Sequence, residues 1–319
     1  MISHPPETQD TAMGHPALLD PWEMAGLWGR GTVLAVLTGT EGPAYRNLGA
    51  ALAVAPDGRF AGAITSGCVE ADLILRAADV RRTGVPQSLR YGMGSPFFDL
   101  KLPCGGGIDV RLFLLKDPAP LLRLQEARAG RKPMALAIAR DGTLSLEGWR
   151  PTAGEGHVFH LGFRPGPYFL IFGTGAETAA FAGLVRSMGH SHLVLSHEPS
   201  TLAAISARGS VVQQIRHEAL LADLQVDADT AIVLFYHDHD YEPVILRHML
   251  QSPAFYIGAQ GSRAAQSKRL ETLVGLSLPA SALARLRGPI GLIPSSRDPQ
   301  TLALSVLAEI TSIYQGMQM

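Results

Sequence analysis

From Tyr168 onward the sequence alternates between short apolar runs and helical stretches, and this alternation constrains the fold more than any other feature. The apolar runs are rich in β-branched and aromatic residues, which is typical of buried strands. They cover residues 168–172, 192–196, 211–215, 231–236 and 255–258. Strands separated by helices form parallel sheets, so we predict a Rossmann-like parallel α/β domain over residues 167–319. An apolar stripe over residues 299–315 predicts a closing amphipathic helix.

The first part of the chain follows a different pattern, with strands close together and few helices between them. Strands are predicted at residues 32–38, 52–55, 60–65, 89–91 and 108–115. The turn 56-PDG-58 between two apolar runs predicts a hairpin. With one helix that starts near Cys68, residues 21–118 are predicted to form a mixed α+β domain, so the fold class of the whole chain is α/β.

Two stretches lie outside these domains. Residues 1–20 are polar, proline-bearing and aperiodic, which predicts a flexible tail. Residues 119–166 are predicted to connect the domains through a helix and a hairpin, and 164-RPGP-167 is a stiff boundary. Two domains suit a chain of 319 residues, because a single core rarely grows past ~250–300 residues.

The composition argues against several classes of function. The net charge is −1 and the basic residues are scattered, so neither nucleic acid nor an anionic membrane is an expected partner. Two cysteines cannot build a disulfide framework. No apolar run reaches the ~18 residues that span a bilayer. We therefore expect a soluble, cytoplasmic protein.

The first candidate site is the turn that carries Cys68. This cysteine follows Gly67 at the start of the predicted helix. A helix start offers free backbone N–H groups and the positive end of the helix dipole, which favour a thiolate and bind anions. Glu70 lies in the same first turn, where a carboxylate is also stabilised.

The second cysteine, Cys104, precedes a run of three glycines that begins with Gly105 and Gly106. Such a run lets a bulky or charged ligand approach the backbone closely. Alternatively, both cysteines are small, buried and inert, which is the commonest fate of a free cysteine. The sequence leaves both interpretations open.

The turn 173-GTGAET-178 lies where a Rossmann fold binds a pyrophosphate. Gly173 and Gly175 match that fingerprint, but Thr178 replaces its third glycine, which predicts that helix and strand lie further apart. The acidic residue expected about 20 residues later is also missing, since the second strand ends in Ser196. We therefore expect a scaffold that binds another phosphate-bearing ligand or none, and no NAD(P).

Two further segments allow both a binding role and a structural role. Gly261 and Ser262 open a helix beside Arg263, so they could hold an anion, or Ser262 could simply cap the helix. The segment 236-YHDHDYE-242 could hold a metal or form the polar rim of a cleft. With only two histidines and no third ligand identifiable there, we predict a rim and no metal site.

Together these motifs resemble the XdhC/CoxI family, accessory proteins of xanthine dehydrogenase, aldehyde oxidoreductase and related molybdenum hydroxylases. The likeness spans about residues 25–312. It rests on the segments 38-TGTEGPAYRNLGA-50, 57-DGRFAGAITSGCVEAD-72, 104-CGGGIDV-110, 171-IFGTG-175, 237-HDHD-240, 256-YIGAQGSR-263, 289-PIGL-292 and 302-LALSVLAEI-310. The pairing of S-G-C-V-E and C-G-G with Y-I-G-x-x-G-S-R and P-I-G-L is a specific combination.

The resemblance implies a cofactor-maturation chaperone rather than a turnover enzyme. Its cargo would be molybdenum cofactor, as molybdopterin or its cytosine dinucleotide, and its partners the large subunit of a molybdenum hydroxylase and a cysteine desulfurase. Cys68, Cys104 and Glu70 are then the candidate reactive residues. The pyrophosphate of the dinucleotide would rest at Gly173–Gly175 or at Ser262–Arg263.

Two other hypotheses stay open on the sequence alone. One is a nucleotide-dependent oxidoreductase that uses the second domain. The other is a scaffold that bridges desulfurase and hydroxylase and binds no small molecule. A homodimer could form through the apolar face of the terminal helix, although docking of that helix within the chain explains the same pattern.

Overall fold

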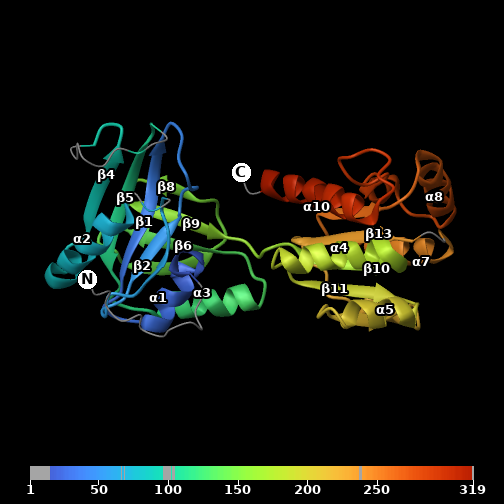
Figure 1. Cartoon of the computed structure of the whole chain (residues 1–319), viewed down its shortest axis with the longest axis horizontal. Helices are drawn as coiled ribbons and strands as arrows, with labels where there is room; N and C mark the ends of the chain where they lie inside the picture. Colours follow the sequence, from blue (N-terminus) through green and yellow to red (C-terminus); the bar gives the residue numbers. More distant parts are fainter. Residues whose placement is uncertain are drawn as a thin grey trace, which may run out of the picture. The chain divides into compact units, whose positions relative to one another are not determined.

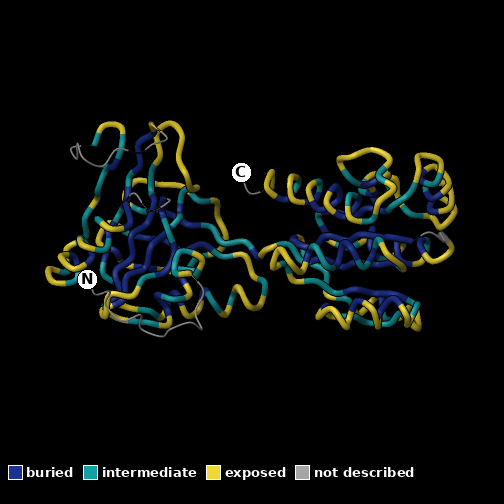
Figure 2. Tube along the Cα trace, in the orientation of Figure 1, coloured by how far each residue is buried: buried dark blue, intermediate teal, exposed yellow. Residues whose placement is uncertain are grey.

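The computed structural model of the chain describes residues 15–65, 67, 69–95, 102, 105–236 and 239–317 (Figure 1). The chain divides into two compact units, residues 1–165 and residues 166–319. Each unit has its own hydrophobic core around buried central strands (Figure 2). A bilayer-spanning helix does not occur among the described residues.

The first unit contains a five-stranded antiparallel sheet. In spatial order its strands are β3 (Phe60–Gly62), β2 (Ala51–Val54), β1 (Val33–Glu41), β5 (Gly107–Leu114) and β4 (Gln87–Gly92). The hairpin predicted around 56-PDG-58 is confirmed, since Val54 of β2 pairs with Phe60 of β3. Because β1 and β4 both run antiparallel to β5, their C-terminal ends meet the start of β5 at one edge of the sheet.

Both faces of this sheet are covered. Helix α2 (Glu70–Thr83) packs on one face. The other face packs against a second sheet and two helices: β7 (Leu144–Gly148), β6 (Met134–Ala139), β9 (Val158–Phe163), β8 (Ala153–Glu155), α1 (Pro21–Trp28) and α3 (Ala119–Ala129). On β1, Val33 and Ala35 face α2 whereas Leu34 and Val36 face the second layer. This two-sided burial explains why residues 32–38 show no polar alternation.

Helix α1 is absent from the sequence-based prediction, although it carries a start signal. Asp20 Oδ1 accepts hydrogen bonds from the N–H groups of Trp22 (2.9 Å) and Glu23 (3.1 Å), and Pro21 occupies the first helical position. The stretch 119–166 is predicted as a connection with a helix and a hairpin. The helix is α3 and the hairpin is β6–β7, but both belong to the first unit and share a core with β1.

The second unit is built on a six-stranded sheet in which every strand is parallel to its neighbours. In spatial order the strands are β12 (Val212–Gln214), β11 (His192–Ser196), β10 (Tyr168–Gly173), β13 (Thr230–Phe235), β14 (Tyr256–Ala259) and β15 (Leu286–Arg287). This is the doubly wound 3-2-1-4-5-6 order of a Rossmann fold. The predicted fold class, a mixed domain followed by a Rossmann-like domain, is confirmed.

Helices cover both faces of this sheet. One face packs against α4 (Gly175–Ser187), α5 (Pro199–Ser206) and α10 (Pro299–Gly316). The other packs against α6 (Ala219–Ala222), α7 (Glu242–Met249), α8 (Arg263–Gly275) and α9 (Ala280–Leu283). Helix α10 buries Val306 and Ile310 in the core that it shares with α4. The apolar face that the sequence offers to a two-fold interface is therefore covered within the unit.

Candidate functional site

Glu70, the first residue of α2, is held by the loop that precedes the helix. Its carboxylate accepts hydrogen bonds from the backbone N–H groups of Ile64 (3.0 Å) and Thr65 (2.6 Å). It also accepts from the N–H of Gly67 (3.0 Å) and from the Thr65 hydroxyl (2.6 Å). Burial of Glu70, which is 9% exposed, would raise its pKa. The hydrogen bonds, that of the Thr65 side chain foremost, outweigh burial and hold the pKa of Glu70 below its ordinary value, so the group is ionised at neutral pH.

These contacts define what Glu70 does. The sequence predicts free N–H groups at this helix start, and the Glu70 carboxylate binds N–H groups of the loop that precedes the helix. Glu70 thus acts on the loop and is a positioning residue. Gly67 has a φ of +110°, and no atom of the described residues lies within 4 Å of the place where its Cβ would stand, so this part of the loop has open space beside it.

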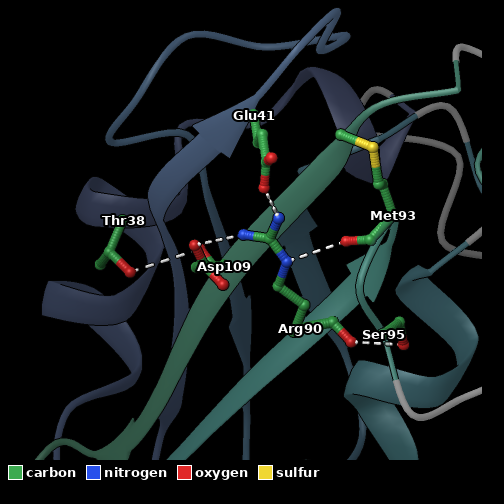
Figure 3. A network of polar contacts seen from close by, with 6 residues as sticks. All are labelled: Thr38, Glu41, Arg90, Met93, Ser95 and Asp109. Atoms are coloured by element: carbon green, nitrogen blue, oxygen red, sulfur yellow. Dashed lines mark hydrogen bonds and ion pairs between the residues drawn. The ribbon is translucent and has the colours of Figure 1, made fainter.

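A second polar cluster fixes the sheet edge where the glycine run enters β5 (Figure 3). Arg90 on β4 donates to the carboxylate of Asp109 on β5 over 2.9 Å, and to the backbone carbonyl of Met93 over 3.0 Å. The same guanidinium forms an ion pair with Glu41 at the end of β1. Thr38 donates to the carbonyl of Asp109 over 3.3 Å. One arginine therefore ties the ends of three strands together.

Two glycines of the run make room for this packing. A Cβ on Gly107 would lie 2.6 Å from Arg90 Nη2, and a Cβ on Gly106 would lie 2.0 Å from the carbonyl oxygen of Pro43. Gly105 differs, because its φ is +73° and no atom from the described part of the chain lies within 4 Å of its Cβ position. Of the predicted pair Gly105 and Gly106, only Gly105 has space for a ligand beside it.

The start of α2 and the start of β5 lie at the same edge of the sheet. The hydroxyl of Tyr91, near the end of β4, donates to Asp72 in the first turn of α2 over 2.5 Å. Tyr91 pairs with Ile108 at the start of β5. The two glycine-flanked turns, which the sequence separates by about thirty-five residues, are thereby brought to one side of the unit.

The two candidate cysteines, Cys68 and Cys104, lie outside the described residues. Their neighbours are described: Val69 follows Cys68, Leu102 stands two positions before Cys104, and both are buried in the same apolar cluster. Val69 and Leu102 are therefore anchored in one core.

The glycine turn after β10 also has an acceptor from within its own unit. Gly175, the first residue of α4, donates its N–H to the Thr201 hydroxyl over 3.0 Å. That hydroxyl in turn donates to the carboxylate of Glu198. Glu198 follows the end of β11, close to the place of the ribose-binding acid in a Rossmann fold, and here it is engaged with the turn itself.

Thr178 does not separate α4 from the sheet as the sequence predicts. Its side chain is fully buried, and its hydroxyl donates to the carbonyl of Thr174 over 3.0 Å. A Cβ on Gly173 would lie 2.5 Å from that hydroxyl oxygen and 2.5 Å from the carbonyl oxygen of Phe235. Gly173 therefore makes the room that the missing third glycine would have made.

At the predicted anion site of Gly261, Ser262 and Arg263, helix capping is confirmed. Ser262 Oγ accepts the N–H of Ala265 over 3.1 Å, and Arg263 is exposed at the first position of α8. A Cβ on Gly261 would lie 3.1 Å from the Cβ of Ala265. The absence of a side chain at Gly261 therefore lets the turn pack closely against the first turn of α8.

A buried ion pair contacts the turn before α8 and was not predicted from the sequence. Arg269 of α8 donates to both carboxylate oxygens of Glu242, at 2.7 and 3.0 Å, and to the carbonyl of Gln260 over 2.7 Å. The pair joins α8 to the start of α7, and the contact with Gln260 joins α8 to the residue that follows β14. The available signal was a basic residue on the apolar stripe of a predicted helix, four positions before Leu273.

The segment 236–242 lies at the carboxyl edge of the parallel sheet, where such folds bind ligands. His237 and Asp238 lie outside the described residues. Tyr236, Asp240 and Tyr241 line a cavity of about 260 Å³. No group of three His, Cys, Asp or Glu side chains suited to a metal ion occurs in the described part of the chain.

Comparison with known proteins gives a consistent family assignment. A model of the XdhC and CoxI family matches residues 28–92, and a model of the XdhC Rossmann domain matches residues 169–310. The molybdenum cofactor insertion chaperone PaoD of Escherichia coli K12 is 34% identical over 312 residues, which cover 97% of this chain and 92% of PaoD. A probable xanthine dehydrogenase subunit of Bacillus subtilis 168 is 25% identical, with 87% of this chain and 92% of that protein covered.

A solved structure shares the fold of both units. The crystal structure of a xanthine dehydrogenase from Bacillus halodurans superposes with a TM-score of 0.71 and covers 93% of this chain and 96% of its own. The sequences are 20% identical, so this likeness concerns the fold.

Proposed function

The chain belongs to the XdhC and CoxI family, and we propose that it is a chaperone that binds molybdenum cofactor and inserts it into a molybdenum hydroxylase. The name and the 34% identity of PaoD support this role. The observation that carries the proposal is the convergence of two open turns, at Gly67 and Gly105, on one edge of the first unit. Each of these glycines is adjacent to one of the two cysteines of the chain.

The N–H groups of Ile64, Thr65 and Gly67 are bonded to Glu70, so the cargo would contact this loop through its side chains. The negative charge of Glu70 also opposes the effect of the helix dipole, which would otherwise favour the thiolate form of Cys68. We therefore assign Cys68 and Cys104 the role of ligands or sulfur carriers whose thiols lose their protons when they meet the metal of the cargo. Glu70 contributes by fixing the loop in advance.

The finer steps of this function follow from the same proposal. The chain receives the cofactor, as molybdopterin or as the cytosine dinucleotide, in the cytoplasm. A cysteine desulfurase is the source of the sulfur for sulfuration of the cofactor, and the large subunit of the hydroxylase accepts the finished cofactor. The chain shields its cargo during these steps and performs no turnover chemistry of its own.

Activation of a cofactor-free hydroxylase tests this function. The full chain is loaded with molybdenum cofactor and mixed with the apo-enzyme, and the rate at which activity appears is measured. We expect Cys68→Ser and Cys104→Ser each to slow activation, and the double variant to abolish it. Glu126→Gln, an exposed change on α3, serves as the control. Full activation by the double variant would refute the role of the cysteines.

A nucleotide-dependent oxidoreductase is the less supported alternative. The Gly175 N–H that would contact a pyrophosphate is already bonded to Thr201, and Glu198 is bonded to the same hydroxyl. Neither group is thus free for a dinucleotide unless the turn rearranges.

A further inference from the structure

The cavity at the carboxyl edge of the second unit is lined by residues of the segments that follow β11, β12 and β13. His197 follows β11, Tyr236 follows β13, and Tyr241 belongs to the short 3-10 helix His239–Tyr241 before α7. Val244 of α7 also lines the cavity and is partly exposed at its mouth. The carboxyl edge of a doubly wound sheet is where ligands of this fold bind.

The three rings of the wall lie nearly parallel. The rings of His197 and Tyr241 stack with centroids 3.7 Å apart and planes inclined by 13°. Tyr236 lies 5.8 Å from His197 and 6.0 Å from Tyr241, with its plane inclined to theirs by 19° and 26°. Parallel aromatic faces and edges of this kind are well suited to a flat ring system placed against them.

Two polar atoms of this wall have no hydrogen-bond partner among the residues that the structure describes. They are the hydroxyl of Tyr236, a residue that is only 2% exposed, and the buried Nδ1 of His197. Burial, reinforced by the nearby Glu242 carboxylate, raises the pKa of Tyr236, so its hydroxyl keeps its proton and can donate. An unsatisfied buried polar atom destabilises the folded chain, and a ligand that forms a hydrogen bond to it recovers part of that loss.

The size of the cavity limits what fits. Pockets for drug-sized ligands measure roughly 300–1,000 Å³, whereas this cavity measures about 260 Å³. It therefore suits one or two fused rings and excludes a complete dinucleotide.

We propose that this cavity binds a planar nitrogen heterocycle, which stacks beside Tyr236, His197 and Tyr241 and hydrogen-bonds to the Tyr236 hydroxyl. This inference rests on the proposed function, because molybdenum cofactor contains such a ring in its pterin and, in the dinucleotide form, in its cytosine. The second unit then holds one ring of the cargo.

Calorimetric titration of the full chain tests the inference. The probes are pterin-6-carboxylic acid, cytidine monophosphate and ribose 5-phosphate, which lacks the heterocycle. We expect saturable binding of at least one ring-bearing probe and none of ribose 5-phosphate. Binding of the pterin alone assigns the cavity to the pterin, and binding of the cytidine nucleotide alone assigns it to the nucleobase.

Two variants locate the binding. Tyr236→Phe removes only the unpartnered hydroxyl and should weaken binding of the ring about tenfold, which corresponds to one hydrogen bond of about 1.4 kcal/mol. Val244→Trp, at the mouth of the cavity, should abolish binding. Tyr256→Phe is the control, because Tyr256 is a buried tyrosine of the same sheet that does not line the cavity.

The outcomes separate this inference from the function on which it rests. Retention of molybdenum cofactor through gel filtration is measured for the same samples. If no heterocycle binds, or if Tyr236→Phe and Val244→Trp bind it as the unaltered chain does, the inference is overturned, even where the chain retains the cofactor. If the heterocycle binds as expected but no cofactor is retained, the proposed ring-binding site is supported and the proposed chaperone function is contradicted.

Discussion

The glycine turn before α2 and the glycine turn before α4 both look, in sequence, like anion sites at a helix start, and each has an internal acceptor of a different kind. In the first unit the Glu70 carboxylate lies directly on the loop amides and is almost fully buried. In the second unit the acceptor is a neutral hydroxyl. Thr201 accepts a hydrogen bond from the Gly175 N–H and donates one to the Glu198 carboxylate.

The difference between the two turns has a consequence for function. A buried charged acceptor that takes several N–H groups is costly to displace, because each donor left without a partner loses about 1–3 kcal/mol. A single hydroxyl bridge costs far less. The first turn is therefore a fixed frame for Cys68, whereas the second is a lightly closed helix start.

Glu70→Gln should have the largest effect of the variants that probe this comparison. The amide side chain places an N–H₂ donor among backbone donors and removes the charge, so we expect a loss of about 3 kcal/mol in the free energy of unfolding of the first unit. For a unit of this size that loss lowers Tm by roughly 6–12 °C.

Tryptophan fluorescence can follow this loss in the first unit alone. All three tryptophans, Trp22, Trp28 and Trp149, belong to residues 1–165. Circular dichroism reports both units, so the second transition should stay in place. Glu126→Gln should leave both transitions unchanged, and a Glu70→Gln chain that unfolds at the temperature of the unaltered protein would show that the carboxylate does not hold the loop.

The pH dependence of the same unit should carry the signature of Glu70. Because the pKa of Glu70 in the folded chain lies below its ordinary value of 4.5, its contribution to stability is complete above that value and disappears as the pH falls through the lowered pKa. Urea unfolding of the unaltered chain and of Glu70→Gln, followed by tryptophan fluorescence, should thus give a stability gap that narrows on acidification. A gap that stays constant down to about pH 3 would contradict the lowered pKa.

Thr201→Val should have a smaller effect, confined to the second unit. The variant removes the hydroxyl that joins Gly175 to Glu198 and should cost about 1 kcal/mol, or roughly 2–4 °C in Tm. Circular dichroism should register the shift, and tryptophan fluorescence should not. Thr272→Val on the exposed side of α8 is the matched control, and equal losses in the two variants would mean that the bridge contributes nothing specific.

NAD(P) should have the smallest effect of all. A ligand that binds the folded chain adds RT ln(1 + [L]/Kd) to its stability. Since the second turn is closed by Thr201 and its acid is engaged, we expect millimolar NAD or NADP to leave both thermal transitions where they are. An upward shift of the second transition would favour the oxidoreductase alternative.

The architecture could be predicted from the sequence where local pattern decides it. The alternation after Tyr168 predicts the parallel sheet and its crossover helices, and the β2–β3 hairpin follows from its turn residues. The short outer strands of the first unit are harder to predict from the sequence. Strand β8, Ala153–Glu155, is exposed throughout and has no apolar pattern to reveal it.

The site was less predictable, because its decisive contacts depend on the folded arrangement. The position of Glu70 in the first turn of a helix predicts a stabilised carboxylate, but the role of Glu70 depends on a loop that turns back over that carboxylate. The pair of Arg269 and Glu242 joins residues that are 27 positions apart. Sequence spacing also gives no sign that Gly173 compensates for Thr178, since that compensation is a matter of packing between strand and helix.

The most direct test of the central claim is the molybdenum content of the chain itself. The full chain and its Cys68→Ser/Cys104→Ser variant are each produced together with molybdenum cofactor, purified by gel filtration, and examined for molybdenum and pterin by mass spectrometry. We expect the unaltered chain to retain both in equal amounts and the double variant to lose them while remaining folded. A double variant that keeps the full molybdenum content, or an unaltered chain that carries none, would contradict the proposal that the edge formed by the two glycine-flanked turns holds the cofactor.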